Sequence, residues 1–314
     1  MQKILITGGA GNVGSSLVKR LEKTGKYKIV VVDNLSTGDV RKLEGTNPGN
    51  LELIKADVNN FNDISPIMIS RSFDYVFHYA AVVGVNRTLN NPIKVLQDIE
   101  GIKNILDLSK NTGVKRVFYS SSSEVYGEPV EFPQNEETTP LNSRLPYAIV
   151  KNVGESFFKS YFREYGLNYT IFRFFNTYGP QQSNDFVIPR FIELAMKNLP
   201  ITIYGDGSQS RTYCYIDDNT ETTQAILENN LYINDIVNIG NDNELSVLEL
   251  AKRILRMTAS SSEIHNMPAL PEGDMTRRMP DISKMKSILN RDLISLEDGL
   301  AATYEAIKMK MGGR

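Results

Sequence analysis

Cysteine, histidine and long apolar runs are all scarce in this chain of 314 residues, and each scarcity excludes a class of protein. Cys214 is the only cysteine, so no disulfide can form within the chain, which fits a reducing cytoplasm. The two histidines, His78 and His265, lie far apart in the sequence without a second ligand nearby, so we expect no metal site. No run approaches the ~18 consecutive apolar residues of a membrane-spanning helix, so we expect no membrane partner.

Neither positive nor negative charge is in excess. The 35 Lys and Arg residues and 37 Asp and Glu residues give a formal net charge of −2, so nothing indicates nucleic acid or an anionic membrane as a partner. The hydrophobic fraction of 41% suits a packed soluble protein. The length allows one large or two modest domains. Because an apolar strand pattern begins at once, we expect no signal peptide.

The pattern over residues 1–33 is strand, glycine loop, helix, strand and acid. Its glycines follow the Gly9-x-Gly11-x-x-Gly14 spacing of the dinucleotide-binding fingerprint, and Asp33 ends the second strand where the fingerprint expects an acid. Such glycines let the backbone turn tightly and approach a pyrophosphate, which then lies against a helix N-terminus. A carboxylate at Asp33 accepts hydrogen bonds from an unmodified ribose and repels a 2′-phosphate. We therefore expect NAD rather than NADP as the cofactor.

Strands and helices alternate through the first half of the chain. Strands are predicted over 3–7, 28–32, 51–56, 73–80, 116–120 and 169–175, and helices over 15–23, 93–110 and 146–166. This alternation predicts an α/β fold with a doubly wound parallel sheet of the Rossmann type, in which ligands bind beyond the carboxyl ends of the strands.

After Asn176 the pattern loosens, and we expect a smaller C-terminal α/β lobe. Its predicted helices lie near 191–197 and 247–257, and its predicted strands at 201–204 and 235–239. We therefore predict an NAD-binding domain over residues 1–176 and a substrate-binding lobe over 177–314, with the chain crossing between them.

Tyr147 and Lys151 form a predicted catalytic pair. They lie four residues apart on the helix that Pro146 begins, so both project from one face. The strand before that helix runs into four serines, 120–123, which places hydroxyls at a carboxyl end. A free phenol has a pKa of about 10 and is a poor base at neutral pH, but a nearby ammonium favours the phenolate. The phenolate can then take a proton from a substrate hydroxyl while the carbon gives a hydride to NAD.

Together these motifs resemble the extended short-chain dehydrogenase/reductase family, and within it the NAD-dependent nucleotide-sugar epimerases and dehydratases. The similarity covers essentially the whole chain. It is carried by Gly8–Gly14, Asp33, Ala56–Val58, His78–Ala81, Ser120–Gly127, Tyr147–Lys151, Arg173–Pro180, Tyr204–Gly207, Arg211–Asp218 and Arg277–Asp281. The resemblance implies NAD that can stay bound through the cycle, a GDP-, UDP- or dTDP-linked sugar as substrate, and a homodimer formed through the helix of Tyr147 and the helix over 93–110.

The resemblance also implies a role for each matching residue. Tyr147 is the base, Lys151 supports it and binds the nicotinamide ribose, and Ser122 bonds the reacting sugar hydroxyl, with Glu124 as a further catalytic residue. The implied cofactor-binding residues are these two helix residues and Gly8, Gly11, Asn12, Val13, Gly14, Asp33, Asn34, Asp57, Val58, Ala80 and Ala81. The implied substrate-binding residues are Ser123, Asn176, Val187, Arg211 and Arg277, of which the two arginines grip phosphates.

Two positions depart from the family's pattern. Asp98 stands where many relatives carry asparagine, and Asn12-Val13 replaces an aromatic-isoleucine pair in the glycine loop. Neither changes the cofactor prediction, although Asn12 can reshape contacts near the pyrophosphate. His78 is predicted to be a core residue at a strand end and not a catalyst. Residues 83–87 and 186–191 are expected to decide which base and sugar bind.

Members of this family begin by oxidising the sugar, usually at C4, and differ in the later steps of the reaction. A 4,6-dehydratase has an Asp-Glu pair before Val-Tyr-Gly; here the pair is Ser123-Glu124, which lacks the acid that protonates the leaving hydroxyl. A uronate decarboxylase resembles the chain better there, with Ser-Glu-Val-Tyr-Gly and an arginine before Pro-Asp-Ile. A 4-epimerase needs no extra acid.

We therefore predict an enzyme that oxidises C4 of a nucleotide-linked sugar to a 4-keto sugar, as a 4-dehydrogenase or a 4-epimerase. The resemblance of the whole sequence also implies a GDP-linked heptose of surface, or capsular, polysaccharide synthesis as one substrate. A UDP-glucuronate decarboxylase-like reaction and 4,6-dehydration stay open as alternatives. A non-catalytic NAD(H)-binding sensor is a remote one, because such proteins usually lose the tyrosine or the lysine and this chain keeps both.

Overall fold

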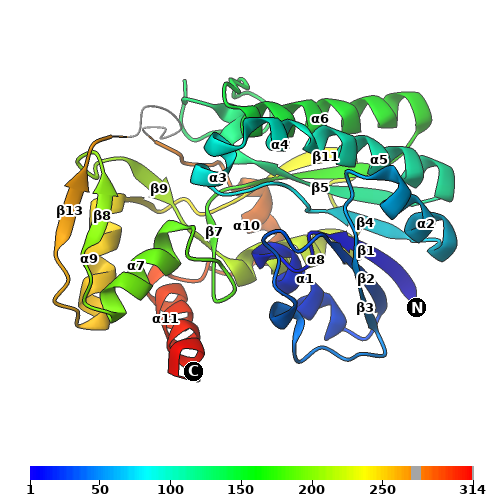
Figure 1. Ribbon diagram of the computed structural model, residues 1–314. Helices are drawn as coiled ribbons and strands as arrows, with labels where there is room; N and C mark the ends of the chain where they lie inside the picture. The colour runs from blue at the N-terminus through cyan, green and yellow to red at the C-terminus, as the bar shows by residue number, and fades with distance from the viewer. Residues whose placement is uncertain (270–276, 313–314) are drawn as a thin grey trace.

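A seven-stranded parallel sheet forms the centre of the computed structural model, which describes residues 1–269 and 277–312 (Figure 1). The strand order is β11-β6-β5-β4-β1-β2-β3. The strands are β1 (Gln2–Thr7), β2 (Tyr27–Asp33), β3 (Leu51–Lys55), β4 (Tyr75–His78), β5 (Arg116–Ser122), β6 (Tyr169–Phe174) and β11 (Asp235–Ile239). The chain leaves β1 toward one edge and returns to build the other, so the order reverses between β1 and β4. The predicted doubly wound α/β fold is confirmed.

Alternating side chains of the central strands bury two separate cores, one on each face of the sheet. Leu5 packs among helices on one face, and its neighbours Ile4 and Ile6 pack on the other. The first face is covered by α2 (Phe61–Arg71), α5 (Asp98–Thr112) and α6 (Pro146–Tyr165), and the second by α1 (Asn12–Glu22), α8 (Ile216–Glu228) and α10 (Ser283–Leu289). Burial on both faces explains why these strands read as continuous apolar runs.

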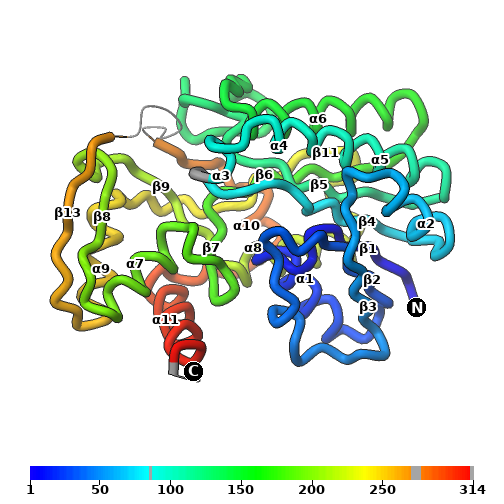
Figure 2. The backbone as a smooth tube through the Cα atoms, viewed as in Figure 1, coloured from blue at the N-terminus to red at the C-terminus, as the bar shows by residue number. Residues whose placement is uncertain are grey.

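A third core holds the smaller region together. It contains α7 (Val187–Met196), α9 (Val247–Thr258), α11 (Leu296–Gly312), and the parallel pair β8 (Ile201–Tyr204) and β13 (Ile264–Met267). Two short pairs join it: β9 (Ser210–Thr212) with β12 (Glu244–Ser246), and β7 (Thr177–Tyr178) with β10 (Cys214–Tyr215). The backbone trace ends on α11, whereas it begins at the sheet (Figure 2).

The strand expected at 235–239 forms, but it lies in the main sheet and not in the smaller region. It pairs in parallel with β6, and its Val237 and Ile239 are buried. Together with α8 and α10 it returns residues after 176 to the larger region. The division of the chain into domains at residue 176 stays a prediction.

Several helices differ locally from those predicted from the sequence. The predicted helix over 93–110 is divided at Gln97 into α4 (Pro92–Leu96) and α5, and α1 begins at Asn12, three residues before the predicted start at Ser15. Helix α2 has no predicted counterpart, because Pro66 inside it breaks the helical pattern.

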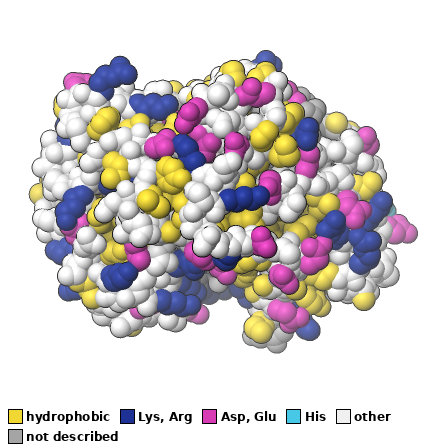
Figure 3. All heavy atoms as spheres, turned by 180° about the vertical axis from the view of Figure 1, so that it is seen from behind, with side chains coloured by type: hydrophobic (Ala, Val, Ile, Leu, Met, Phe, Trp, Pro, Cys, Tyr) yellow, Lys and Arg dark blue, Asp and Glu magenta, His cyan; other side chains and the backbone are white. Residues whose placement is uncertain are grey.

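The remaining short elements are η1 (Val40–Leu43), α3 (Val85–Asn90) and η2 (Ser123–Tyr126). On the face seen in Figure 3, acidic and basic side chains are interspersed.

Candidate functional site

A cavity of about 820 Å³ extends along the carboxyl ends of the central strands and into the smaller region. Nearly all of the predicted site residues line it. On the cofactor side these are Gly8, Gly11, Asn12, Val13, Gly14, Asp33, Asn34, Asp57, Val58, Ala80 and Ala81. The predicted catalytic and substrate-binding residues that line it are Ser122, Ser123, Glu124, Tyr147, Lys151, Asn176, Val187 and Arg211. Cofactor and substrate sites therefore belong to one continuous space.

The glycine loop has a close-packed backbone that excludes side chains. Gly8 has a φ of +69°, and a Cβ there would lie 2.7 Å from the backbone nitrogen of Ala80. A Cβ at Gly14 would lie 2.4 Å from the carbonyl oxygen of Gly8. Gly11 caps α1 without a side-chain hydrogen bond, and the buried Oδ1 of Asn12 has no partner among the described residues. These features fit a dinucleotide pyrophosphate at the helix N-terminus.

Asp33 fixes the geometry between the glycine loop and the end of β2. Its Oδ2 accepts from the backbone N–H of Ala10 at 3.0 Å, and its Oδ1 accepts from the N–H of Leu35 at 2.8 Å. Asn34 donates through Nδ2 to Asp57 at 3.1 Å, which joins the ends of β2 and β3. The two acids lie where the adenosine half of a dinucleotide would bind in this fold.

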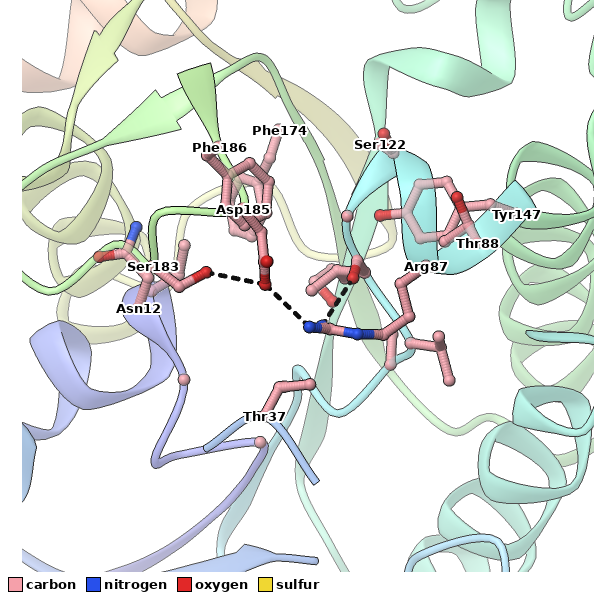
Figure 4. Close-up of a pocket in the computed structure, with 18 of the residues that line it drawn as sticks. Asn12, Thr37, Arg87, Thr88, Ser122, Tyr147, Phe174, Ser183, Asp185 and Phe186 are labelled. Carbon is pink, nitrogen blue, oxygen red and sulfur yellow. Dashed lines mark hydrogen bonds and ion pairs between the residues drawn. The ribbon is translucent and has the colours of Figure 1, made fainter. Parts of the chain in front are cut away.

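The predicted catalytic residues meet where α6 crosses the end of β5. Tyr147 and Ser122 lie close together on the cavity wall (Figure 4), and Ser122 is the hydrogen-bonding side chain that favours the Tyr147 phenolate. Lys151 is buried, donates from Nζ to the carbonyl oxygen of Ser120 at 2.7 Å, and lies 5.7 Å from the centroid of the Tyr147 ring. Pro146 is the first residue of α6, where its lack of an N–H leaves no donor without a partner. Tyr147 follows it in the first turn of the helix.

Burial sets the protonation of these groups. It raises the pKa of Tyr147, and the Glu124 carboxylate acts in the same direction, while the Ser122 hydrogen bond and Arg278 oppose it. Burial lowers the pKa of Lys151 to about 8, and Asp98 opposes that shift. The phenol is therefore protonated in the protein alone, and a neighbouring positive charge is needed to stabilise the phenolate.

His78 is a buried core residue, as predicted. It shares a 2.9 Å hydrogen bond with Thr7 Oγ1, and its ring stacks on Tyr119. Burial lowers the pKa of His78 to about 3. Its imidazole is neutral at physiological pH, which suits a packing role.

The neighbouring arginines at 277 and 278 lie differently with respect to the cavity, and the substrate role of Arg277 stays a prediction. Arg277 does not line the cavity: its Nε donates to Glu244 at 2.6 Å, and its guanidinium lies 4.2 Å from the centroid of the Phe132 ring. Arg278 does line the cavity; its side chain is 8% exposed and lies 3.7 Å from Glu124. Side chains alternate along an extended segment, so the paired arginines in the sequence could not show which one faces inward.

Arg87 and Asp185 form an ion pair across the cavity. Neither residue is among those predicted from the sequence as catalytic or binding. Arg87 donates to Asp185 at 2.8 Å and to the carbonyl oxygen of Val83 at 3.1 Å, and Ser183 donates to Asp185 at 3.2 Å (Figure 4). The pair joins α3 to the loop before α7. Both segments lie within or next to the ranges expected to decide substrate choice.

Comparison with known proteins places this site in a family. The family model for the NAD dependent epimerase/dehydratase family matches residues 4–240. This protein belongs to the NAD-dependent epimerase/dehydratase family. It is therefore an enzyme of the extended short-chain dehydrogenase/reductase type with NAD as its cofactor, and the predictions of family, enzyme and cofactor are confirmed.

Relatives within the family catalyse more than one reaction. The UDP-N-acetyl-alpha-D-glucosaminuronate decarboxylase of Bacillus cytotoxicus is 34% identical, over 97% of this chain and 97% of its own length. The UDP-glucose 4-epimerase of Thermotoga maritima, solved with UDP-glucose, is 32% identical with a TM-score of 0.92, covering 99% of this chain and 100% of the other. The Thermus thermophilus UDP-glucose 4-epimerase, solved with NAD, is 26% identical with a TM-score of 0.90, covering 98% and 99%. The chain thus belongs among nucleotide-sugar epimerases, decarboxylases and dehydratases.

Residues 1–269 and 277–312 contain neither a membrane-crossing helix nor a metal-holding cluster. None of the helices there combines the length and the apolar character that a membrane crossing requires. Within the same residues, no three or more His, Cys, Asp or Glu side chains are arranged to hold a metal ion.

Proposed function

We propose that this enzyme oxidises the C4 hydroxyl of a nucleotide-linked sugar to a ketone, as a 4-dehydrogenase or a 4-epimerase. The observation that carries the proposal is the meeting of Tyr147, Ser122 and Lys151 on the wall of the cavity that also contains the glycine loop. A proton acceptor and a hydroxyl donor thus share one ligand space with the dinucleotide cradle.

Each of the three residues has a defined part in the proton transfer. The Ser122 hydroxyl holds the oxygen of the reacting sugar hydroxyl next to Tyr147. The Tyr147 oxygen takes the hydroxyl proton as the C4–H bond breaks and the C4 carbonyl forms. The Lys151 ammonium stabilises the phenolate that accepts this proton. When bound, NAD supplies the hydride acceptor and a positively charged ring.

The substrate's phosphates are proposed to bind at Arg211 and Asn176. Arg211 is largely buried in the cavity wall, and Asn176 donates from Nδ2 to the carbonyl oxygen of Thr212, which positions its amide beside β9. A guanidinium matches phosphate geometry. We further propose a UDP-, GDP- or dTDP-linked sugar, including a GDP-linked heptose of capsular polysaccharide synthesis, as substrate, tightly held NAD, and a cytoplasmic homodimer formed through α5 and α6.

Decarboxylation of a nucleotide-linked uronate is the second proposed reaction, and Arg278 favours it. The buried Nε of Arg278 has no hydrogen-bond partner among the described residues, and the guanidinium stands beside Glu124 near Tyr147. A buried guanidinium with a free donor suits the carboxylate of a sugar acid. Once C4 is a ketone, the bond between C5 and the carboxylate carbon can break with loss of carbon dioxide. Its electron pair passes to the C4 oxygen as an enolate, and C5 then takes up a proton.

A substrate panel separates these outcomes. Purified enzyme would be incubated with UDP-, GDP- and dTDP-linked neutral sugars and uronates, while NADH absorbance and product mass are followed together. A product lighter by two hydrogens indicates dehydrogenation, an unchanged mass with a new sugar configuration indicates epimerisation, and loss of carbon dioxide indicates decarboxylation. No turnover and no NADH with any nucleotide sugar would contradict the proposal.

The state of the cofactor can be tested in the same preparation. Protein purified without added NAD should release NAD or NADH on denaturation if the cofactor is tightly held. Cofactor-free protein that reaches full activity only with added NAD would contradict tight binding while leaving the reaction proposal intact.

A further inference from the structure

A buried acid, Asp98, lies on the wall of the cavity and takes no part in the proton transfer described above. It stands in the first turn of α5, and its side chain is 9% exposed. A buried charge is costly unless it is paired and hydrogen-bonded. Its partners therefore indicate what it does.

Both carboxylate oxygens of Asp98 are used to hold cofactor-side loops. Oδ2 accepts from the backbone N–H of Val82 at 2.8 Å, and Oδ1 accepts from the side-chain amide of Asn59 at 3.2 Å. Val82 lies in the loop after β4, and Asn59 lies in the loop after β3. Helix α5 packs closely on this contact, since a Cβ added at Gly101 would lie 2.4 Å from Asn59 Oδ1. One side chain thus connects two loops that line the cofactor side of the cavity.

Asp98 and Lys151 are both buried and line the same cavity. The lysine is buried and donates to the Ser120 carbonyl, and Asp98 is the acid whose carboxylate favours its charged form. Burial lowers the pKa of Lys151 to about 8 despite that carboxylate. In return, burial raises the pKa of Asp98, and its two hydrogen bonds and the charge of Lys151 oppose the rise.

No other group around this pair supplies the same charge among the described residues. The titratable groups that face Asp98 or Lys151 from the neighbouring elements are Asp57, His78, Tyr119 and Tyr147. Burial raises the pKa of the two phenols and lowers the pKa of the imidazole to about 3, so these three are uncharged at neutral pH. Asp57 is a like charge that raises the pKa of Asp98.

We propose that Asp98 is a positioning residue: its buried carboxylate fixes the two cofactor-side loops and keeps Lys151 in its ammonium form. The inference rests on the proposed function, in which the ammonium supports the Tyr147 phenolate. Two N–H donors converge on residue 98, one on each carboxylate oxygen, and a carboxylate accepts both hydrogen bonds. An asparagine at this position would turn its own N–H₂ toward one of the two donors unless that neighbour also turned.

The substitution Asp98→Asn tests the charge with little change of shape. The Asn59 amide can turn so that its Oδ1, which has no partner among the described residues, accepts from the new amide. Because Asp98 raises the pKa of Lys151, its removal lowers that pKa. The alkaline limb of the kcat/KM profile, where Lys151 loses its proton, should therefore move to lower pH by about one unit.

Asn59→Ala is the matched control for a purely structural role. It removes a loop hydrogen bond but keeps the carboxylate, so it should lower the melting temperature and leave the alkaline limb where it is. An alkaline limb that stays in place in Asp98→Asn, with a stability loss like that of Asn59→Ala, would overturn the charge role.

A second measurement needs neither activity nor a folded Asp98 variant. Lys151→Met removes the partner charge and leaves the Asp98 carboxylate buried without it. The resulting loss of unfolding free energy should be largest near neutral pH and should shrink as the pH falls and Asp98 is protonated. A loss that is constant between about pH 4 and pH 8 would overturn the coupling. Because this readout is independent of turnover, it distinguishes failure of the Asp98 role from failure of the proposed reaction.

Discussion

The two sides of the cavity are built in different ways. The cofactor side is mostly backbone: Gly8, Gly14 and Ala80 approach one another so closely that a single added Cβ would collide with main-chain atoms. The substrate side is built mostly from side chains of distant segments, and Arg87, Asp185 and Arg278 are charged ones among them.

This difference shows how each side can vary. A backbone cradle recognises features shared by every dinucleotide, and it tolerates almost no substitution. Side chains that reach in from separate elements can be exchanged one at a time without disturbing the sheet. The same fold can therefore keep one cofactor and serve different sugars, as the range of relatives indicates.

The largest expected effect comes from the point where the two sides meet. Tyr147→Phe removes the proton acceptor and keeps the ring, so kcat should fall by about 10³-fold or more. Binding of the nucleotide sugar, measured by calorimetry, should change little. Turnover equal to that of the unmodified enzyme would contradict the role of Tyr147.

Gly14→Ala tests whether the glycine loop binds NAD on the cofactor side of the cavity. Because the new Cβ would lie 2.4 Å from the Gly8 carbonyl oxygen, the loop must shift, and NAD affinity should fall by about 100-fold with a loss of about 1–3 kcal/mol in unfolding free energy. NAD titration and thermal unfolding measure the two effects. Gly49→Ala is the matched control, since its nearest contact would be 3.3 Å from Asn47 Oδ1 on an exposed turn. Equal NAD affinity in both variants would show that the loop is not the cradle.

Arg278→Gln tests the substrate side, with Arg277→Gln as its neighbour control. Loss of the inward-facing guanidinium should lower kcat/KM about 100-fold for a uronate substrate, whereas the change at Arg277, which pairs with Glu244 outside the cavity, should cost less than about 3-fold. Steady-state kinetics on both variants decide between them. A larger loss of kcat/KM in Arg277→Gln than in Arg278→Gln would support the predicted role of Arg277 in substrate binding.

The smallest effect is expected at the pair across the cavity. The Arg87 and Asp185 side chains are 34% and 47% exposed, so solvent screens their attraction. A double-mutant cycle with Arg87→Gln and Asp185→Asn should give a coupling of about 0.2–1 kcal/mol, seen in KM and weakened by salt. Fully additive effects of the two substitutions would show that the ion pair does not matter for substrate binding.

Most of the fold could be predicted from local patterns. The helix from Pro146 to Tyr165 and the strands at 201–204 and 235–239 begin and end at the predicted residues or within one of them. Helix α2 could not be predicted, because Pro66 interrupts its helical pattern and packing on α5 overrides that local signal. The place of β11 could not be predicted either, since strand pairing depends on contacts between residues far apart in the sequence.

By itself, the sequence determined the α/β class, the NAD loop, the acid at Asp33 and the Tyr147–Lys151 pair. These features are encoded in short, fixed spacings: a glycine turn, a strand end, and one turn of a helix. Only the tertiary structure decided that Arg278 faces the cavity, that Arg87 meets Asp185, and that Asp98 meets Asn59. Each of those contacts joins side chains from separate elements, and their direction depends on how the elements pack.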